Sequence, residues 1–180
     1  LQVREGMWVN RKGRQLTDRT VGIIGCGHIG KDLVSLLRPF SCRILANDIL
    51  EFPRFYAENA VTPTGLEELI RSADIVTLHV PLDNSTRNML SRERLEMMKP
   101  DAILINAARG GLVDEVALKR MLQEGRLSAA AFDVFDTEPP EDIELLRLSN
   151  FVATPHIGGS SEEAVLAMGR AAIHGLDHNR

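Results

Sequence analysis

The chain has 180 residues, of which 44% are hydrophobic and 26% are charged, and its formal net charge is −4. This length suits one domain with its own core, and the composition is ordinary for a soluble globular protein. The chain has a negative net charge, whereas nucleic-acid-binding proteins are typically basic, so we expect no nucleic-acid partner.

The cysteines and the apolar runs indicate the cellular setting. Cys26 and Cys42 have neither the spacing of paired metal ligands nor the number needed for a disulfide framework, which favours a reduced, cytoplasmic setting. No apolar run reaches the roughly 18 residues that cross a bilayer, so we expect no membrane partner. The chain starts at Leu1 instead of methionine and ends within a helical pattern, which predicts a piece of a longer protein.

From Thr20 onward, apolar runs of strand length alternate with helical patterns. Most of these runs are apolar on both sides, as buried parallel strands are. The predicted strands are residues 21–25, 43–47, 75–80, 102–107, 129–135 and 151–154. Such alternation predicts an α/β fold with a doubly wound parallel sheet and right-handed crossovers.

Helix signals lie between these runs. After Gly27, apolar residues recur at helical spacing until Pro39 ends the pattern. Two segments, 64–67 and 160–163, fit a capping box, in which a hydroxyl and a glutamate three residues later satisfy each other's helix-end amides.

A further helix is predicted after the fourth run. Asp114 and Glu115 place acids in its first turn, and Gly125 is expected to end it. The side chains expected to face inward are Val116, Leu118, Met121 and Leu122.

A glycine-rich turn follows the first strand and opens the first helix. Gly25, Gly27 and Gly30 have the Gly-x-Gly-x-x-Gly spacing. The first glycine permits the tight turn, the second lets a pyrophosphate approach the backbone, and the third lets helix and strand pack closely. The helix N-terminus supplies amides and positive dipole to the phosphates, so the motif in this context predicts dinucleotide binding.

Asp48 ends the second predicted strand, where an acid can accept hydrogen bonds from the adenosine ribose hydroxyls. A carboxylate at this point repels a 2′-phosphate, so NAD is favoured over NADP. The alternative is an aspartate that only forms a turn after the strand.

Three polar motifs follow later strands, at residues 106–110, 133–140 and 154–159. Loops that follow parallel strands gather at one edge of the sheet, where ligands bind. Arg109, Glu138 and His156 should therefore converge on one cofactor. That set suits an oxidoreductase that acts on a hydroxy or keto acid.

The ordered motifs resemble the D-isomer-specific 2-hydroxyacid dehydrogenases, the family of phosphoglycerate, glycerate and D-lactate dehydrogenases. The resemblance extends from about Gly6 to the end and is carried by the glycine loop and residues 78–82, 106–115, 131–135, 138–140 and 154–159. It implies that residues 1–180 are a Rossmann-type dinucleotide-binding domain inserted into a substrate domain, both flanking segments of which are missing here.

The resemblance also implies roles for individual residues. His156 would be the acid/base, Glu138 would bind and orient its ring, and Arg109 would grip the substrate carboxylate and polarise the neighbouring carbonyl. Asp133 would hydrogen-bond the nicotinamide carboxamide. Further cofactor contacts, several through backbone atoms, would come from His28, Ile29, Val80 and Ala107.

Each of these residues also has an ordinary structural interpretation. The histidine could bond only to backbone, the glutamate could be one more acid of a solvated loop, and the arginine could lie on the surface. No histidine pairing predicts a metal site, because His174 and His178 share helical spacing but are better explained by a solvated face.

The leading hypothesis is an NAD-dependent D-2-hydroxyacid dehydrogenase, here as its cofactor domain and inactive in isolation. The alternative is an NAD-sensing scaffold like the C-terminal-binding corepressors, which resemble the same family. A small 2-hydroxy or 2-keto acid is the expected substrate, and its identity stays open. We expect a homodimer formed through this domain, with Met7 and Trp8 packing against a partner or the missing lobe.

Overall fold

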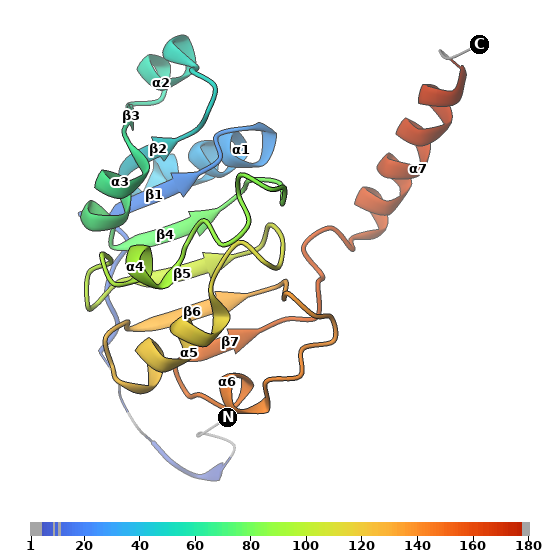
Figure 1. Cartoon of the computed structure of the whole chain (residues 1–180). Coiled ribbons are helices and arrows are strands. Elements are labelled where there is room, and N and C mark those ends of the chain that lie inside the picture. The colour runs from blue at the N-terminus through green and yellow to red at the C-terminus, as the bar shows by residue number, and fades with distance from the viewer. Residues whose placement is uncertain (1–4, 9, 11, 178–180) are drawn as a thin grey trace.

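The computed structural model describes residues 5–8, 10 and 12–177. Seven parallel strands form one sheet in the order β3-β2-β1-β4-β5-β6-β7 (Figure 1). They are β1 (Thr20–Ile24), β2 (Arg43–Asn47), β3 (Val61–Pro63), β4 (Ile75–Leu78), β5 (Ile103–Asn106), β6 (Ala129–Phe132) and β7 (Phe151–Ala153). The chain builds outward from β1 to β3, then returns to place β4 on the other side of β1. This is the doubly wound sheet that the sequence predicted.

Helices cover both faces of the sheet. They are α1 (His28–Leu37), the 3-10 helix η2 (Arg38–Phe40), α2 (Pro53–Glu58), α3 (Leu66–Ser72), α4 (Arg92–Leu95), α5 (Glu115–Gln123), α6 (Ile143–Leu146) and α7 (Glu162–Asp177). Neighbouring residues of β1 show the two faces, because Ile23 packs with Val34 of α1 whereas Ile24 packs in the cluster that contains Leu118 of α5. Alternation of this kind is what a strand buried on both sides requires.

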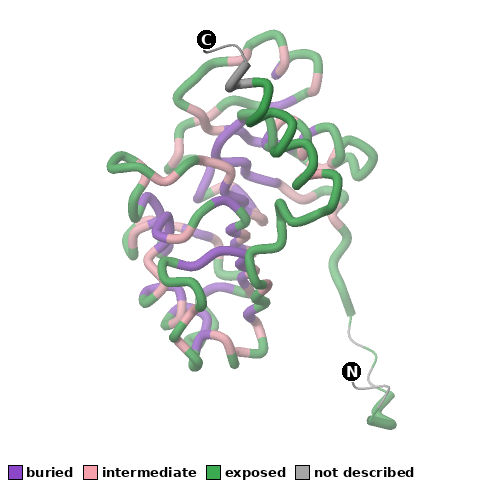
Figure 2. The backbone as a smooth tube through the Cα atoms, turned by 90° about the vertical axis from the view of Figure 1, so that its right-hand side faces the viewer, coloured by how far each residue is buried: buried purple, intermediate pink, exposed green. Residues whose placement is uncertain are grey.

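Helix α7 differs from the other helices. It projects away from the sheet (Figure 1), and its described side chains are exposed except for half-buried Ala164, so that most of the helix is green in Figure 2. Several of its exposed side chains are large and apolar, namely Val165, Leu166, Met168 and Ile173.

The strand predictions differ from the structure mainly at the ends. The third and fifth predicted strands, 75–80 and 129–135, end earlier, at Leu78 and Phe132, where the chain turns into the loops that carry polar residues. Strand β3 was missed because it has only three residues, with a proline as the last. It lies at the edge of the sheet, where a proline is tolerated.

Both predicted capping boxes are wrong. Thr64 donates its backbone amide to the carbonyl of Ala46 at 2.9 Å, which extends the β2–β3 pairing, and Gly65 caps α3 with no side-chain hydrogen bond. At the other site the cap shifts by one residue, because Ser161 Oγ accepts from the amide of Ala164 at 3.1 Å. An alanine cannot return the bond, so no box forms.

The helix predicted after Asp114 is α5. Asp114 is its N-cap, with Oδ1 accepting from the Ala117 amide at 2.9 Å, and Gly125 follows its end with a left-handed φ of +67°. Leu118, Met121 and Leu122 are buried as predicted. The prediction for Val116 was wrong: its side chain is 74% exposed, because the first turn of α5 overhangs a surface cavity.

Candidate functional site

The glycine loop joins β1 to α1, and its backbone geometry agrees with what was predicted for each glycine. Gly25 has a φ of +96°, and a Cβ on Gly30 would lie 2.2 Å from the carbonyl oxygen of Gly25. A Cβ on Gly27 would meet no atom within 4 Å, so this glycine opens onto free space. Gly27 also caps α1 without a side-chain hydrogen bond. The first-turn amides of α1 thus point into an open cradle that fits an anion such as a pyrophosphate.

Other predicted cofactor residues lie at the same edge of the sheet as this loop. His28 and Ile29 are exposed in the first turn of α1, and the side chain of Val80 comes within 2.9 Å of a Cβ placed on Gly25. Ala107 is exposed directly after β5. All follow the carboxyl ends of strands, as expected for one ligand-binding edge.

Asp48 lies beside the same loop. Its Oδ2 accepts from the amide of Cys26 at 2.6 Å, and its Oδ1 accepts from the amide of Leu50 at 2.8 Å. A carboxylate has about four acceptor positions, so one remains on each oxygen for a ribose hydroxyl. The turn-forming interpretation is correct, since the bond to Leu50 closes a turn after β2, and it leaves acceptor positions for the predicted ribose role.

Glu138 and His156 form a direct pair. Glu138 Oε2 lies 2.8 Å from His156 Nδ1, and Glu138 Oε1 accepts from the amide of Phe135 at 3.1 Å. The histidine contact, followed by the Phe135 amide, lowers the pKa of Glu138 below its ordinary value. An ionised Glu138 requires a proton on Nδ1, which leaves Nε2 as the ring atom for exchange with a ligand.

Asp133 holds the loop that carries His156. Its carboxylate is 8% exposed and accepts from Thr154 Oγ1, from the Ile157 amide at 2.9 Å and from the Gly158 amide at 2.8 Å. Burial raises the pKa of Asp133, but these hydrogen bonds outweigh burial and the pKa is lowered overall. One acceptor position on Oδ2 remains for a ligand.

Arg109 lies in the loop after β5, and its side chain bonds to its own loop, with Nη1 2.6 Å from the carbonyl of Ala108. Buried Asn106 shapes this loop: its Nδ2 donates to the Arg109 carbonyl at 2.9 Å, and its Oδ1 accepts from the Ala108 amide at 3.2 Å. Sequence reasoning gave Asn106 no role. A polar residue that ends an apolar strand was the available signal.

Of the three predicted polar residues, the structure brings Glu138 and His156 into direct contact, whereas Arg109 lies in a neighbouring loop. A cavity of about 250 Å³ beside Glu138 and His156 is lined by Asp133, Phe135, Glu138, Pro139, Pro140, Thr154, Pro155 and His156. Arg109 is not among these residues. Its loop nevertheless touches theirs, because a Cβ on Gly110 would lie 1.8 Å from the carbonyl oxygen of Phe135.

Comparison with known proteins identifies the family. The sequence profile described as "D-isomer specific 2-hydroxyacid dehydrogenase, NAD binding domain" matches residues 1–158. The chain belongs to this family. It is 43% identical over 171 residues to D-3-phosphoglycerate dehydrogenase of Methanocaldococcus jannaschii, covering 93% of this chain and 32% of that protein. It is 40% identical over 174 residues to hydroxypyruvate reductase of Thermotoga maritima, covering 94% and 56%.

Solved structures agree with this membership of the D-isomer specific 2-hydroxyacid dehydrogenase family. A glyoxylate reductase from Paecilomyes thermophila superposes with a TM-score of 0.90 at 29% identity, covering 98% of this chain and 54% of that one. The NAD complex of the family member from Lactobacillus delbrueckii ssp. bulgaricus gives 0.86 at 31% identity, covering 97% and 58%. The chain thus spans between about a third and three fifths of these relatives, and it is the NAD-binding domain of the family.

No group of three or more His, Cys, Asp or Glu within residues 5–8, 10 and 12–177 could hold a metal ion. None of the helices described there is long and apolar enough to cross a bilayer. His178, named above with His174, lies outside the described residues.

We predict that two loop glycines respond oppositely to alanine. Gly30→Ala forces a Cβ against the Gly25 carbonyl and should destabilise the fold by about 1–3 kcal/mol, as overpacking does. Gly27→Ala meets open space, so stability should change little while NADH affinity falls, because the methyl group occupies the cradle. Urea denaturation and calorimetric titration check both. Normal NADH binding by Gly27→Ala would contradict the role assigned to that glycine.

The lowered pKa of Asp133 predicts a pH dependence. A carboxyl group with a depressed folded-state pKa stabilises the fold above its unfolded value of about 3.9, and this contribution is lost as pH falls through the folded value. Asp133→Asn should therefore cost about 2 kcal/mol at pH 7, and the difference from the unsubstituted protein should narrow toward pH 3. Urea denaturation at both pH values measures this, and an equal difference at both would contradict it.

Proposed function

We propose that this chain is the cofactor domain of an NAD-dependent dehydrogenase that transfers hydride between nicotinamide and a D-2-hydroxy or 2-keto acid. The observation that carries the proposal is the pair of Glu138 and His156, 2.8 Å apart at the sheet edge that also bears the glycine loop. The sequence-predicted alternative, an NAD-sensing scaffold, gains no support from the relatives named above, which carry dehydrogenase or reductase names.

The residues of the chain divide the reaction between them. Bound NAD supplies the carbon that accepts or returns the hydride. His156 Nε2 exchanges a proton with the substrate oxygen, while Glu138 binds Nδ1 and fixes the orientation of the ring. Arg109 binds the substrate carboxylate bidentately, and this charge draws electron density from the neighbouring carbonyl. For this its side chain must leave the carbonyl of Ala108.

The cofactor contacts follow from the same edge. The amides at the start of α1 bind the pyrophosphate, with Gly27 allowing close approach. Asp48 accepts from the ribose hydroxyls with its remaining lone pairs and excludes a 2′-phosphate. Asp133 offers its free Oδ2 position to the carboxamide. His28, Ile29, Val80 and Ala107 complete the contacts around the nucleotide.

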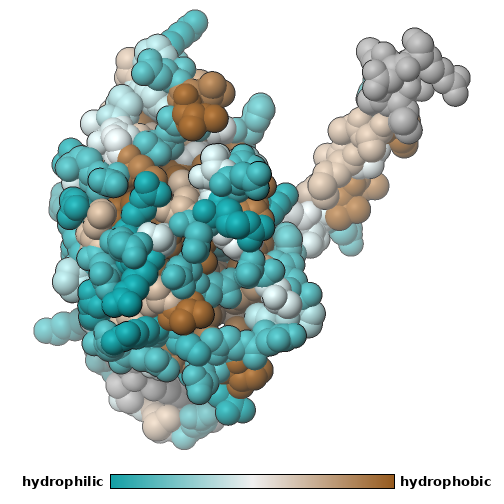
Figure 3. All heavy atoms as spheres, in the orientation of Figure 1, coloured by the Kyte–Doolittle hydropathy of each residue, from teal (hydrophilic) through white to brown (hydrophobic). Residues whose placement is uncertain are grey.

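The surroundings of the domain are part of the proposal. We infer that flanking segments form a substrate domain and that two copies associate through this domain in the cytoplasm. Exposed apolar side chains support the association: Trp8 is 87% exposed, and tan spheres with patches of brown lie over α7 in Figure 3. The substrate is a small 2-hydroxy or 2-keto acid, and the flanking segments would choose among such acids.

Cofactor choice is tested on this chain by calorimetric titration with NADH and, separately, NADPH. We expect NADH to bind and NADPH to bind more weakly. Asp48→Ala also loses the bond to the Cys26 amide, so affinity for both should fall. The ratio of the two dissociation constants is therefore the diagnostic quantity, and it should move toward one. An unchanged ratio would remove the ribose role of Asp48.

The catalytic assignment is tested in the protein that includes the flanking segments. His156→Ala should lower kcat by about 10²–10⁴, as loss of a general acid/base does, while NADH affinity stays nearly constant because the ring acts on substrate. Glu138→Gln should give a smaller loss, since glutamine can still contact Nδ1 but carries no charge. A His156→Ala protein that turns over normally, or that no longer binds NADH, would argue against the assignment.

A further inference from the structure

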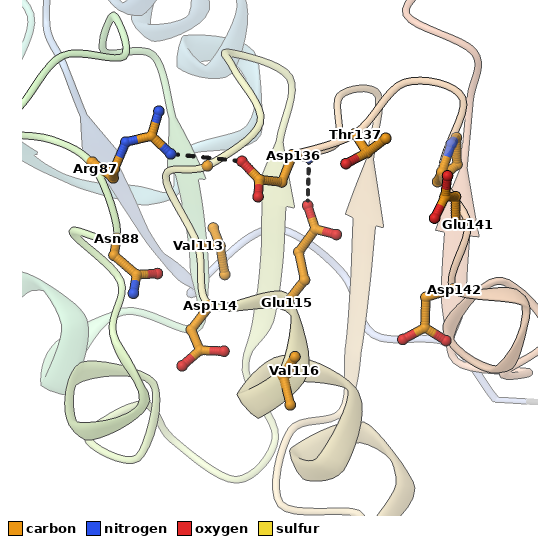
Figure 4. Close-up of a pocket in the computed structure, with 12 residues that line it drawn as sticks. Arg87, Asn88, Val113, Asp114, Glu115, Val116, Asp136, Thr137, Glu141 and Asp142 are labelled. Atoms are coloured by element: carbon orange, nitrogen blue, oxygen red, sulfur yellow. Dashed lines mark hydrogen bonds and ion pairs between the residues drawn. The ribbon is translucent and has the colours of Figure 1, made fainter.

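Two carboxylates bind successive backbone amides in the loop after β6. The amide of Phe135 donates to Glu138 Oε1 at 3.1 Å, and the next amide, that of Asp136, donates to Glu115 Oε1 at 2.9 Å. Figure 4 shows Glu115 rising from the start of α5 toward the backbone of Asp136. The first carboxylate is the one that also contacts His156. The segment from Phe135 to Glu138 is therefore also held by Glu115, a side chain to which the proposed mechanism gives no role.

Glu115 links two loops of the candidate site. It is the first residue of α5, which follows directly on the loop that carries Arg109 and Gly110. Gly110 packs against the carbonyl of Phe135 so closely that a Cβ would lie 1.8 Å away. The two loops thus meet at the backbone of Gly110 and through the side chain of Glu115. A substitution at Glu115 changes the second contact without pressing a Cβ against the Phe135 carbonyl.

A different contact in the same region is weaker. Arg87 Nη1 lies 3.7 Å from Asp136 Oδ1, with the two side chains 59% and 64% exposed. Exposed ion pairs of this length contribute little. The loop position therefore depends on the backbone amide of Asp136 more than on its carboxylate.

The environment of Glu115 fits a structural acceptor. It is half-buried beside a cavity of about 460 Å³ that Asp136 and Asp142 also line. Burial, and then the charges of these two acids, raise its pKa, while the bond from the Asp136 amide lowers it. The charges of Asp136 and Asp142 repel an ionised Glu115, so its charge brings no favourable interaction with these neighbours. The favourable contact that this side chain makes is the hydrogen bond from the Asp136 amide.

We propose that Glu115 is a positioning residue for the Glu138–His156 pair. By holding the Asp136 amide it fixes the turn from Phe135 to Glu138, so that one carboxylate can bind the Phe135 amide and the His156 ring together. The geometric part stands on the contacts alone. Its consequence for turnover rests on the proposed function.

The test compares four single variants of the full chain by nuclear magnetic resonance. Glu115→Gln keeps an oxygen at the same reach without the charge, whereas Glu115→Asp keeps the charge with a shorter reach. Glu115→Ala removes the oxygen. Asp136→Ala is the matched control, because it deletes the ion pair with Arg87 and leaves the backbone amide in place.

The readouts are the ¹⁵N shifts of the His156 ring, which report where its proton resides, and the ¹³C shift of the Glu138 carboxyl group. Glu115→Gln and Asp136→Ala should match the unsubstituted chain. In Glu115→Ala and Glu115→Asp, the Nδ1-protonated form should lose its preference, and the pKa of Glu138 should rise toward its ordinary value. If Glu115→Ala fails to fold, the Asp and Gln pair still separates reach from charge.

Unchanged His156 and Glu138 signals in both Glu115→Ala and Glu115→Asp would overturn the proposal. The same shift changes in Glu115→Gln would also overturn it. The charge of Glu115, and not its bond to the Asp136 amide, would then hold the Glu138–His156 pair. In the protein with its flanking segments, kcat should fall on the order of tenfold in Glu115→Asp, with the KM for NADH unchanged. An inactive unsubstituted protein whose spectra behave as expected would refute the proposed function and leave the positioning role intact.

Discussion

The carboxylate of Asp133 is the constraint on which the site depends. Asp133 directly follows β6, yet its carboxylate accepts from the amides of Ile157 and Gly158 after β7, and its backbone carbonyl accepts from the amide of His156 at 2.9 Å. His156 has a φ of +52°, a left-handed conformation that costs a non-glycine residue about 1–2 kcal/mol. Hydrogen bonds that buried Asp133 accepts from this loop offset this cost. The ring of His156, the proposed acid/base, is therefore held at the sheet edge by the hydrogen bonds of Asp133.

Backbone contact extends this constraint to the neighbouring loop. The carbonyl of Phe135 occupies the space of a side chain at Gly110, so the segment bearing Arg109 lies against the segment bearing Glu138. Asn106 binds the carbonyl of Arg109 in one segment, and Glu115 binds the amide of Asp136 in the other. Three strand ends thus act as one body. In the proposed mechanism the side chain of Arg109 leaves the carbonyl of Ala108 to reach substrate, whereas the pair of Glu138 and His156 is already formed.

Sequence patterns predicted the parts of this site that repeat along a strand or helix. Strand positions followed from apolar runs, and the glycine turn followed from spacing, because both depend on neighbours in the chain. The predicted cap at Thr64 was wrong for the opposite reason, because a tertiary contact decided it: the amide of Thr64 pairs with the carbonyl of Ala46. The second capping box was wrong by a local shift of one residue, to Ser161, and Val116 lies beside an open cavity that helical spacing does not reveal. The bond from Asp136 to Glu115 joins residues far apart in the chain. No periodicity reports such a contact, so only the folded structure could reveal it.

Exposure explains why the domain needs more than its own residues to perform the proposed reaction. The side chains of His156 and Glu138 are 48% and 38% exposed, so water competes for both. A proton donor and a carboxylate-binding arginine act more strongly where water is excluded and the local dielectric is low. Every group proposed to touch substrate lies at the open edge of the sheet, with the core on the other side. The fold therefore supplies orientation, and a surface that closes over this edge must supply the dry environment.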